Sequence, residues 1–255
     1  MSFITQIHAS RHRRIRFTVL MALSLILTIR SVSAQEVRVA VGMALPPYIL
    51  QATNSGMELD IAREALALKG HTITPVYLPF ARVGRALTSR NVDAALTTNE
   101  GAGLENVYLS DSHIRYQNVA VSLREQGLKL SDVADLAGYS VFAFQNATRY
   151  LGKAFADMAA NSSHYFEKAN QAIQIKMLFS ERIDLIVLDI NIFKYYRQNE
   201  TEIDTSAPVT IHTLFPPTFY KVSFLDEDLR DQFNEGLAEL RRTGKYDEII
   251  GRYIR

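Results

Sequence analysis

Asp189 is the residue of this sequence whose setting most directly suggests chemistry. It ends a short apolar run, residues 183–188, and a carboxylate stranded at the end of a buried strand favours a cation as its partner. A positively charged ligand could supply that partner. The alternative is that Asp189 caps a helix beginning at Asn191, because aspartate is a favoured N-cap residue.

The segment that ends at Asp189 has an earlier counterpart in the chain. Residues 180–189 are SERIDLIVLD and residues 89–98 are SRNVDAALTT. In both, a helical pattern ends in Leu-x-Ser, an Asp follows, and polar side chains close an apolar run. Such a run is typical of a buried parallel strand, and open α/β sheets bind ligands at the carboxyl ends of these strands. The repeat predicts two similar halves with a ligand between them, and adds Thr97, Thr98 and Asn99 to the candidate binding residues.

Strand and helix patterns alternate around these two segments. Strands are predicted at residues 36–42, 72–78, 92–96, 115–123, 139–144, 165–166, 183–188, 208–214 and 220–224. Helices are predicted from Pro79 and at residues 57–69, 131–136, 147–160, 171–179, 191–197, 228–242 and 246–253. This alternation predicts an α/β fold with two lobes, each a mixed sheet flanked by helices.

Residues 1–34 have the pattern of an export signal. Residues 11–16 are basic, residues 17–29 form an apolar segment too short for a comfortable membrane span, and Val32-Ser33-Ala34 offers small residues for a signal peptidase. We expect cleavage before Gln35 and a periplasmic protein. The alternative is an uncleaved N-terminal anchor, which the short apolar segment disfavours.

Charge and cysteine content exclude several classes of function. The chain has 28 basic and 27 acidic side chains; five arginines and no acidic residue lie in residues 1–34, so cleavage changes the net charge from +1 to −4. Nothing in this balance predicts binding to nucleic acid. The absence of cysteine excludes disulfides, thiolate metal sites and a lipid-modified cysteine. We expect a monomer with neither metal nor cofactor.

An ordered series of short motifs runs along the chain. It comprises Pro46-Pro47-Tyr48, GMELDIA at 56–62, NVDAAL at 91–96, Ser110-Asp111, DLAGYSV at 135–141, RIDLIVLD at 182–189 and GKYDEI at 244–249. In this order the motifs resemble the family 3 periplasmic solute-binding proteins, the polar amino-acid receptors of ABC importers. The resemblance covers residues 36–254. It implies a type II periplasmic-binding fold, with residues 35–120 and 214–255 in lobe 1, and residues 121–213 forming lobe 2 with the hinge strands.

The resemblance also implies roles for individual residues in an interlobe cleft that closes around its ligand. Asp189 matches the partner of a ligand ammonium group, and Tyr48 and Phe80 match aromatic positions that enclose the ligand. For the two aromatic residues, plain core packing is the alternative. Glu58 is a further candidate binding residue.

A second group of candidates follows the predicted strand at 139–144. Gln145, Asn146 and Thr148 match a turn whose N–H groups hold a ligand carboxylate at a helix N-terminus, although Asn146 or Thr148 could instead only cap that helix. Arg149 and Arg82 could each add a cation to the cleft or lie in solvent.

One departure from the family concerns the ligand. Amino-acid receptors of this family carry Thr-x-x-Arg after the third strand, and that arginine holds the ligand carboxylate through a bidentate contact. Residues 99–105 are NEGAGLE and contain no arginine. Either Arg82, Arg115 or Arg149 replaces it, or the ligand is not a standard α-amino acid.

We therefore expect a non-enzymatic binding protein that captures a small polar ligand, amino-acid-like or an amine or organic acid, for an ABC permease. One alternative is a dehydratase of the cyclohexadienyl or arogenate type on the same fold. It would need a general acid or base, for which Glu58, Glu100 and His113 are candidates. Another is a soluble sensor that docks on a receptor kinase. The sequence has no Gly-x-Ser-x-Gly, His-Glu-x-x-His or phosphate-binding glycine loop.

Overall fold

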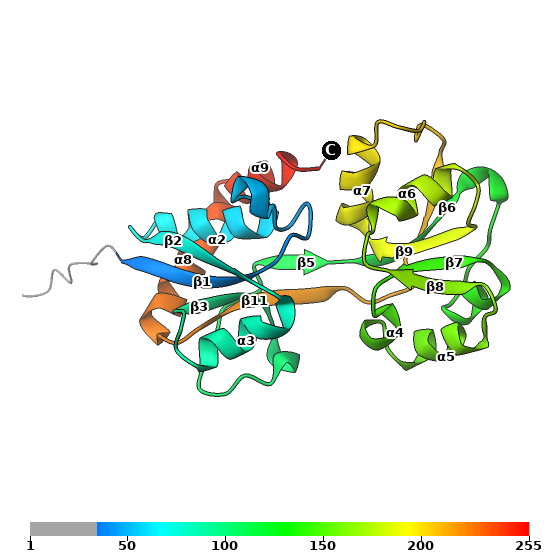
Figure 1. Ribbon diagram of the computed structural model, residues 1–255. Coiled ribbons are helices and arrows are strands. Elements are labelled where there is room, and N and C mark those ends of the chain that lie inside the picture. The colour runs from blue at the N-terminus through cyan, green and yellow to red at the C-terminus, as the bar shows by residue number, and fades with distance from the viewer. Residues whose placement is uncertain (1–34, 255) are drawn as a thin grey trace, which may run out of the picture. The chain divides into compact units, whose positions relative to one another are not determined.

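The computed structural model describes residues 35–254, and Glu36–Arg255 form one compact unit. The predicted export signal, residues 1–34, lies outside the described residues. Within the described part of the chain, no helix is both long and apolar enough to cross a bilayer. Two sheets organise the unit, each with helices on both faces (Figure 1). This confirms the two-lobed α/β fold.

The first sheet combines the amino-terminal strands with a strand from late in the chain. Its order is β2-β1-β3-β11-β4, and β5 pairs with β11 beside this path. The strands are β1 (Glu36–Gly42), β2 (Thr72–Leu78), β3 (Ala94–Thr98), β4 (Tyr108–Leu109), β5 (Ile114–Tyr116) and β11 (Thr218–Phe224).

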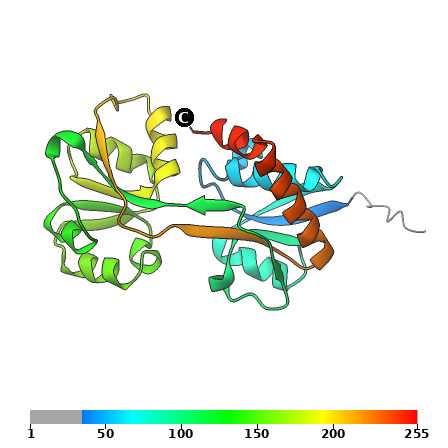
Figure 2. The same cartoon turned by 180° about the vertical axis from the view of Figure 1, so that it is seen from behind.

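The second sheet has the order β10-β6-β9-β7-β8. Its strands are β6 (Asn118–Leu123), β7 (Val141–Phe144), β8 (Tyr165–Lys168), β9 (Leu185–Asp189) and β10 (Val209–His212). Strand β5 leads into β6, and β10 leads into β11, so two segments connect the sheets; Figure 2 shows them side by side.

The two sheets share one pattern of strand directions, as the repeat in the sequence predicts. Strand β1 is parallel to β2 and β3, and β11 is antiparallel to β3. Likewise β7 is parallel to β8 and β9, and β6 is antiparallel to β9. The repeated segments thus supply β3 and β9, which occupy corresponding places.

The turns before β3 and β9 also correspond. Arg90 and Glu181 have φ angles of 56° and 55°, and their N–H groups donate to the carbonyls of Leu87 and Leu178. These left-handed residues end each preceding helix and turn the chain into the strand. The following Asp accepts backbone N–H groups from the neighbouring part of its sheet: Asp93 from Arg38, and Asp184 from Ser140.

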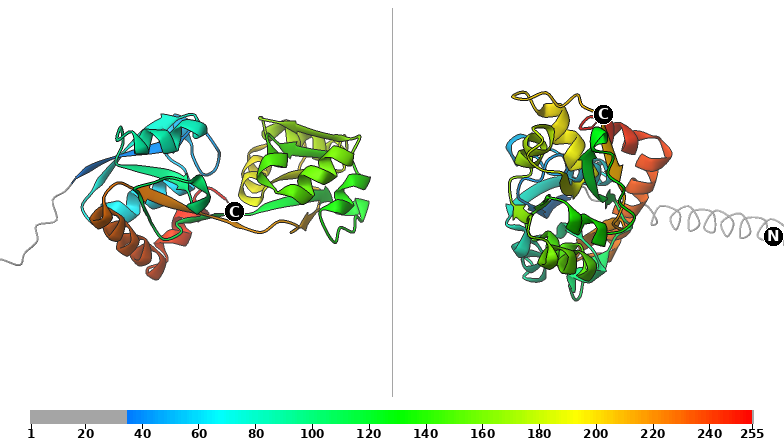
Figure 3. Two further views of the ribbon diagram at one scale, coloured as in Figure 1. Left: turned by 90° about the horizontal axis from the view of Figure 1, so that it is seen from below. Right: turned by 90° about the vertical axis from the view of Figure 1, so that its right-hand side faces the viewer.

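Helices cover both faces of the two sheets (Figures 1 and 3). In the first sheet, Val39 and Val41 belong to the cluster that includes buried residues of α2 and α8, while Ala40 packs in the cluster of α3. This alternation follows from the two-residue period of a strand. The helices are α2 (Met57–Ala67), α3 (Phe80–Thr88), α4 (Ala147–Tyr150), α5 (Lys153–Asn161), α6 (Ala172–Phe179), α7 (Ile190–Asn199), α8 (Glu227–Arg242) and α9 (Lys245–Gly251).

Two predicted elements are divided in the structure. The strand predicted at 115–123 is broken at Gln117, because β5 pairs in the first sheet and β6 in the second. The helix predicted at 147–160 becomes α4 and α5, separated at Gly152, whose φ of 87° is incompatible with a continuous helix. Short 3₁₀ helices complete the described part of the fold, at Gln51–Thr53, Glu100–Ala102, Arg124–Gln126 and Ala134–Gly138. The last of them lies where residues 131–136 were predicted to be helical.

The contact between α2 and α8 predicts the effect of one substitution. A Cβ added at Gly236 would lie 2.0 Å from the carbonyl oxygen of Ala65, so the two helix backbones would have to separate. We expect Gly236→Ala to lower the free energy of unfolding by about 1–3 kcal/mol, the usual cost of overpacking, as measured by urea denaturation. Gly251→Ala is the matched control, because an added Cβ there meets nothing within 4 Å. Equal stability of the two variants would contradict this helix packing.

Candidate functional site

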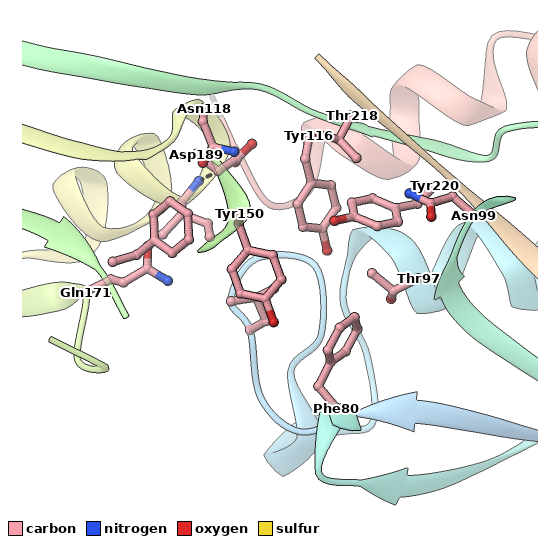
Figure 4. A pocket seen from close by; sticks show the side chains of 13 residues that line it. Phe80, Thr97, Asn99, Tyr116, Asn118, Tyr150, Gln171, Asp189, Thr218 and Tyr220 are labelled. Atoms are coloured by element: carbon pink, nitrogen blue, oxygen red, sulfur yellow. Dashed lines mark hydrogen bonds between the residues drawn. The ribbon is translucent and has the colours of Figure 1, made fainter. Parts of the chain in front are cut away.

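A cavity of about 390 Å³ lies where the carboxyl ends of strands from both sheets meet. We call it the main cavity. Its volume is near the lower end of the range for small-molecule sites, about 300–1,000 Å³. Figure 4 shows its lining: Leu45, Phe80, Thr97, Asn99, Tyr116, Asn118, Phe144, Tyr150, Gln171, Asp189, Ile192, Thr218 and Tyr220.

An adjoining cavity of about 410 Å³ shares several of these residues, among them Phe80, Thr97, Tyr116 and Tyr150. It extends along the loop after β1 and over the turn after β7, where Gln145 and Asn146 line it.

Asp189 is the only charged side chain among the described residues that line either cavity. It is 3% exposed and carries several hydrogen bonds. Its Oδ1 accepts the Tyr48 hydroxyl and the Asn191 N–H, each at 2.8 Å, and the Ile192 N–H at 3.1 Å. Its Oδ2 accepts the Gln117 N–H at 2.7 Å.

Asp189 therefore caps α7 and also lines the main cavity. The chain itself supplies four donors to this carboxylate, which the sequence pattern did not indicate. Burial raises the pKa of Asp189 above its ordinary value, and the hydrogen bonds from Tyr48 and the backbone oppose that rise only in part. The buried carboxylate is still incompletely compensated, which favours a positively charged neighbour.

Tyr48 lies behind the cavity lining. It is fully buried, its ring stacks on Tyr116 with 3.8 Å between centroids, and it is not among the lining residues. The loop that holds it depends on Gly56, whose φ is 128° and at which a Cβ would lie 2.2 Å from the Tyr48 carbonyl oxygen. In the structure, Tyr48 supports Asp189 and Tyr116; its contact with a ligand stays a prediction.

Glu58 forms the centre of a buried polar network beneath the cavity. Its Oε1 accepts the Thr97 hydroxyl at 2.8 Å and lies 3.1 Å from Nε2 of His113, while Oε2 accepts the Tyr116 hydroxyl at 3.0 Å. Glu58 and His113 are both 0% exposed and neither lines a cavity. The network therefore orients Thr97 and Tyr116, the two members that do line the cavities.

Thr97 has a strained backbone. Its φ is 57°, an outlier for a β-branched residue, at an irregularity in the pairing of β3 with β11. The bulge places Thr97 and Asn99 in the lining, while the Thr98 hydroxyl contacts the Lys221 carbonyl and Ser223. Glu100, in the loop where the family's arginine was sought, forms an ion pair with Lys221.

The turn after β7 is occupied by a carboxylate of the chain itself. Glu167, in β8, accepts the N–H of Asn146 at 2.6 Å and the N–H of Thr148 at 3.0 Å. It also accepts the hydroxyls of Tyr165 and Thr148. Burial opposes ionisation here, but these hydrogen bonds lower the pKa of Glu167 below its ordinary value. Asn146 makes no side-chain cap hydrogen bond to α4.

Of the residues predicted from the sequence, four line the main cavity: Phe80, Thr97, Asn99 and Asp189. Gln145 and Asn146 line only the adjoining cavity. The remaining six lie outside both linings: Tyr48, Glu58, Arg82, Thr98, Thr148 and Arg149.

Three tyrosines of the main cavity were missed: Tyr116, Tyr150 and Tyr220. Tyr116 and Tyr220 lie on the two segments that connect the sheets, and their rings meet edge to face at 4.8 Å. Phe80 and Tyr150, although part of the lining, are 52% and 59% exposed. The sequence signal that could have identified these tyrosines was their position: Tyr116 and Tyr220 lie at the starts of predicted strands, and Tyr150 lies shortly after a predicted strand end.

Among the described residues, no group of three or more His, Cys, Asp or Glu side chains could hold a metal ion. The functional groups that line the two cavities are one carboxylate, neutral amides and hydroxyls, and aromatic rings. These groups suit reversible binding of a small molecule.

Comparison with known proteins is consistent with this geometry. The sequence matches the family described as bacterial extracellular solute-binding proteins, family 3, over residues 37–255. No curated protein matches it. Among solved structures, an ancestral cationic amino acid solute-binding protein is similar with a TM-score of 0.69 and 17% identity, covering 86% of this chain and 96% of the other.

Two further structures have the same fold. One is an amino acid ABC transporter substrate-binding protein from Streptococcus pneumoniae bound to L-arginine, with a TM-score of 0.60, 17% identity and coverage of 86% and 94%. The other is a histidine kinase sensor domain with similarity to periplasmic binding proteins, with a TM-score of 0.61, 19% identity and coverage of 86% and 95%. At these identities the likeness shows the fold alone.

The Tyr48–Asp189 hydrogen bond generates a stability prediction. Tyr48→Phe keeps the stacked ring but removes the hydroxyl that donates to Asp189 and accepts from Asn191. We expect a loss of about 1–3 kcal/mol in the free energy of unfolding, because a buried carboxylate loses a donor. Tyr108→Phe is the matched control: Tyr108 is 39% exposed and contacts Arg230 through its ring. If both variants unfold at the same urea concentration, the hydrogen bond does not stabilise the fold.

Proposed function

We propose that this chain, which belongs to the bacterial extracellular solute-binding proteins of family 3, captures a small solute in the main cavity and delivers it to the permease of an ABC importer. The observation that carries the proposal is the main cavity, with strands of both sheets ending around the single charged lining residue, Asp189. A ligand there would contact both sheets at once and would therefore stabilise a closed arrangement of the lobes.

We propose two lobes close to the predicted division, with residues 35–120 and 214–255 in lobe 1 and residues 121–213 in lobe 2, and we move the first boundary to Gln117, because β6 (Asn118–Leu123) pairs in the second sheet. The break between β5 and β6 at Gln117 supports a hinge at this position, because the chain changes sheets there. A hinge needs few residues, provided that they can absorb the change in backbone angles.

The geometry of the cavity favours a binding protein over an enzyme. An enzyme of the dehydratase type needs an acid or base within reach of the substrate. Glu58 and His113 are fully buried and lie within hydrogen-bonding distance of each other, and Glu100, which is not a lining residue, forms an ion pair with Lys221. Asp189, the remaining ionisable acid of the cavity, is held by four donors in a capping role.

Ligand capture is tested by incubating the purified protein with a bacterial metabolite extract, followed by native mass spectrometry. We expect one bound small molecule per chain, and at least a tenfold lower affinity for it in Asp189→Asn, since about 1.4 kcal/mol of lost charge interaction corresponds to tenfold. Asp111→Asn, which makes the same change at an exposed loop position, is the control and should bind as the wild type does. Absence of any captured molecule would refute the proposed function.

Export to the periplasm is a separate part of the proposal. Cleavage after Ala34 predicts a mature protein whose first residue is Gln35, which intact-mass measurement of the periplasmic fraction determines directly. Retention of residues 1–34 in a membrane fraction would instead identify an uncleaved anchor.

A further inference from the structure

We propose that the ligand is a small organic cation without a carboxylate group, such as an alkyl or aryl amine, rather than a zwitterionic amino acid or an organic acid. This inference rests on the proposed function, because it assumes that the main cavity binds the ligand. It goes beyond that function by assigning the charge and the chemical class of the molecule.

The first support is the distribution of charge at the cavities. Asp189 is the only charged side chain among the described lining residues. Its Oδ1 already accepts three hydrogen bonds, but Oδ2 accepts only the Gln117 N–H. Oδ2 is therefore the less crowded of the two carboxylate oxygens, and a ligand N–H would approach Asp189 there.

The second support is the aromatic wall. Figure 4 shows the rings of Phe80, Tyr116, Tyr150 and Tyr220 around the same space, and Phe144 completes the set. These rings come from both sheets and from two helices. Aromatic faces attract organic cations, and the attraction is stronger when the cation loses water. The ring faces have no comparable attraction for a carboxylate.

The third support is the placement of the arginines that could hold a carboxylate. Arg82, Arg115 and Arg149 are all exposed, and none of them lines either cavity. Lys221, next to Tyr220 in β11, has its Nζ 2.6 Å from the Glu100 carboxylate. A carboxylate in the main cavity would therefore face Asp189 without a compensating cation.

The fourth support is Glu167. The N–H groups of Asn146 and Thr148 at the turn after β7 donate to this carboxylate, and the Thr148 hydroxyl does the same. Donors that could otherwise have received a ligand anion are thus occupied by the chain itself. The protein presents one carboxylate toward the cavity and keeps a second one beside it.

Together these features disfavour the binding of a ligand carboxylate and favour the binding of a ligand cation. A carboxylate would lose water, gain no charged partner and meet like charge at Asp189. An ammonium group would pair with Asp189, whose burial leaves it incompletely compensated, and its hydrocarbon part would contact the aromatic rings.

The test uses pairs of compounds that differ only in the carboxylate: agmatine with arginine, tyramine with tyrosine, and histamine with histidine. Isothermal titration calorimetry measures each affinity on the full mature chain. In any pair that binds, we expect the amine to bind more than about tenfold tighter, the loss expected when a buried charged group has no partner. An amino acid that binds as tightly as its amine would overturn the assigned class, while the proposed function would stand.

Arginine variants test whether an arginine side chain moves into the cavity when a ligand binds. Arg82→Ala and Arg149→Ala remove the exposed cations of α3 and α4, and both should leave the affinity for the amine within about twofold of the wild type. A loss of more than tenfold in the affinity of either variant for the matching amino acid would show that an arginine enters the site to hold its carboxylate, which contradicts the inference.

The molecule captured from a metabolite extract tests the proposed binding function and the proposed ligand class separately. A captured cation without a carboxylate supports the inference, even if none of the six test compounds binds. A captured amino acid or organic acid overturns the ligand class but leaves the binding function intact. If the extract yields no bound molecule, the function and the inference both fail.

Discussion

The interaction on which the site depends is the solvation of the Asp189 carboxylate by the protein itself. Its donors come from three separate segments: the loop after β1 through Tyr48, the connection between β5 and β6 through Gln117, and the first turn of α7. A buried carboxylate left without donors would cost several kcal/mol. Because the Asp189 carboxylate needs these hydrogen-bond donors, the three segments are held close to it at the edge of the cavity. Tyr48 in turn stacks on Tyr116, and Tyr116 donates to Glu58, so that the constraint extends from one side of the cavity to the other.

The same physics explains the character of the binding surface. The carboxylates near the cavity are held by hydroxyl and backbone donors, while the arginines of this region lie in solvent and Lys221 is paired with Glu100. A cavity lined in this way would bind a positively charged ligand more tightly than a negatively charged one, as we propose. Its aromatic walls reinforce that preference, since a ring face attracts a cation and offers an anion nothing. Family membership defines the fold, whereas the ligand charge that we propose rests on the side chains that line the cavity.

The internal repeat was visible in the sequence because its signals are local. A helix ending in Leu-x-Ser and an Asp before an apolar run lie within a few residues of each other, and the structure places both copies in corresponding strands, β3 and β9. The breaks at Gln117 and Gly152 were not visible in the same way. The first depends on which remote strands the two parts of the segment join, and the second on a backbone angle that a helical pattern of side chains does not reveal.

The sequence by itself determined the α/β class, the paired halves and the strand ends near which a ligand site had to lie, because hydrophobic periodicity and helix-stop signals act over short distances. It thereby placed Thr97, Asn99 and Asp189 at the cavity, and the family resemblance added Phe80. Tertiary structure decided which neighbouring side chains join them. The bulge in β3 directs Thr97 into the lining and gives Thr98 other partners, stacking places Tyr48 behind Tyr116, and Glu167 reaches the turn after β7 from an adjacent strand. Each of these outcomes depends on contacts between segments far apart in the chain, and no local pattern of residues encodes such contacts.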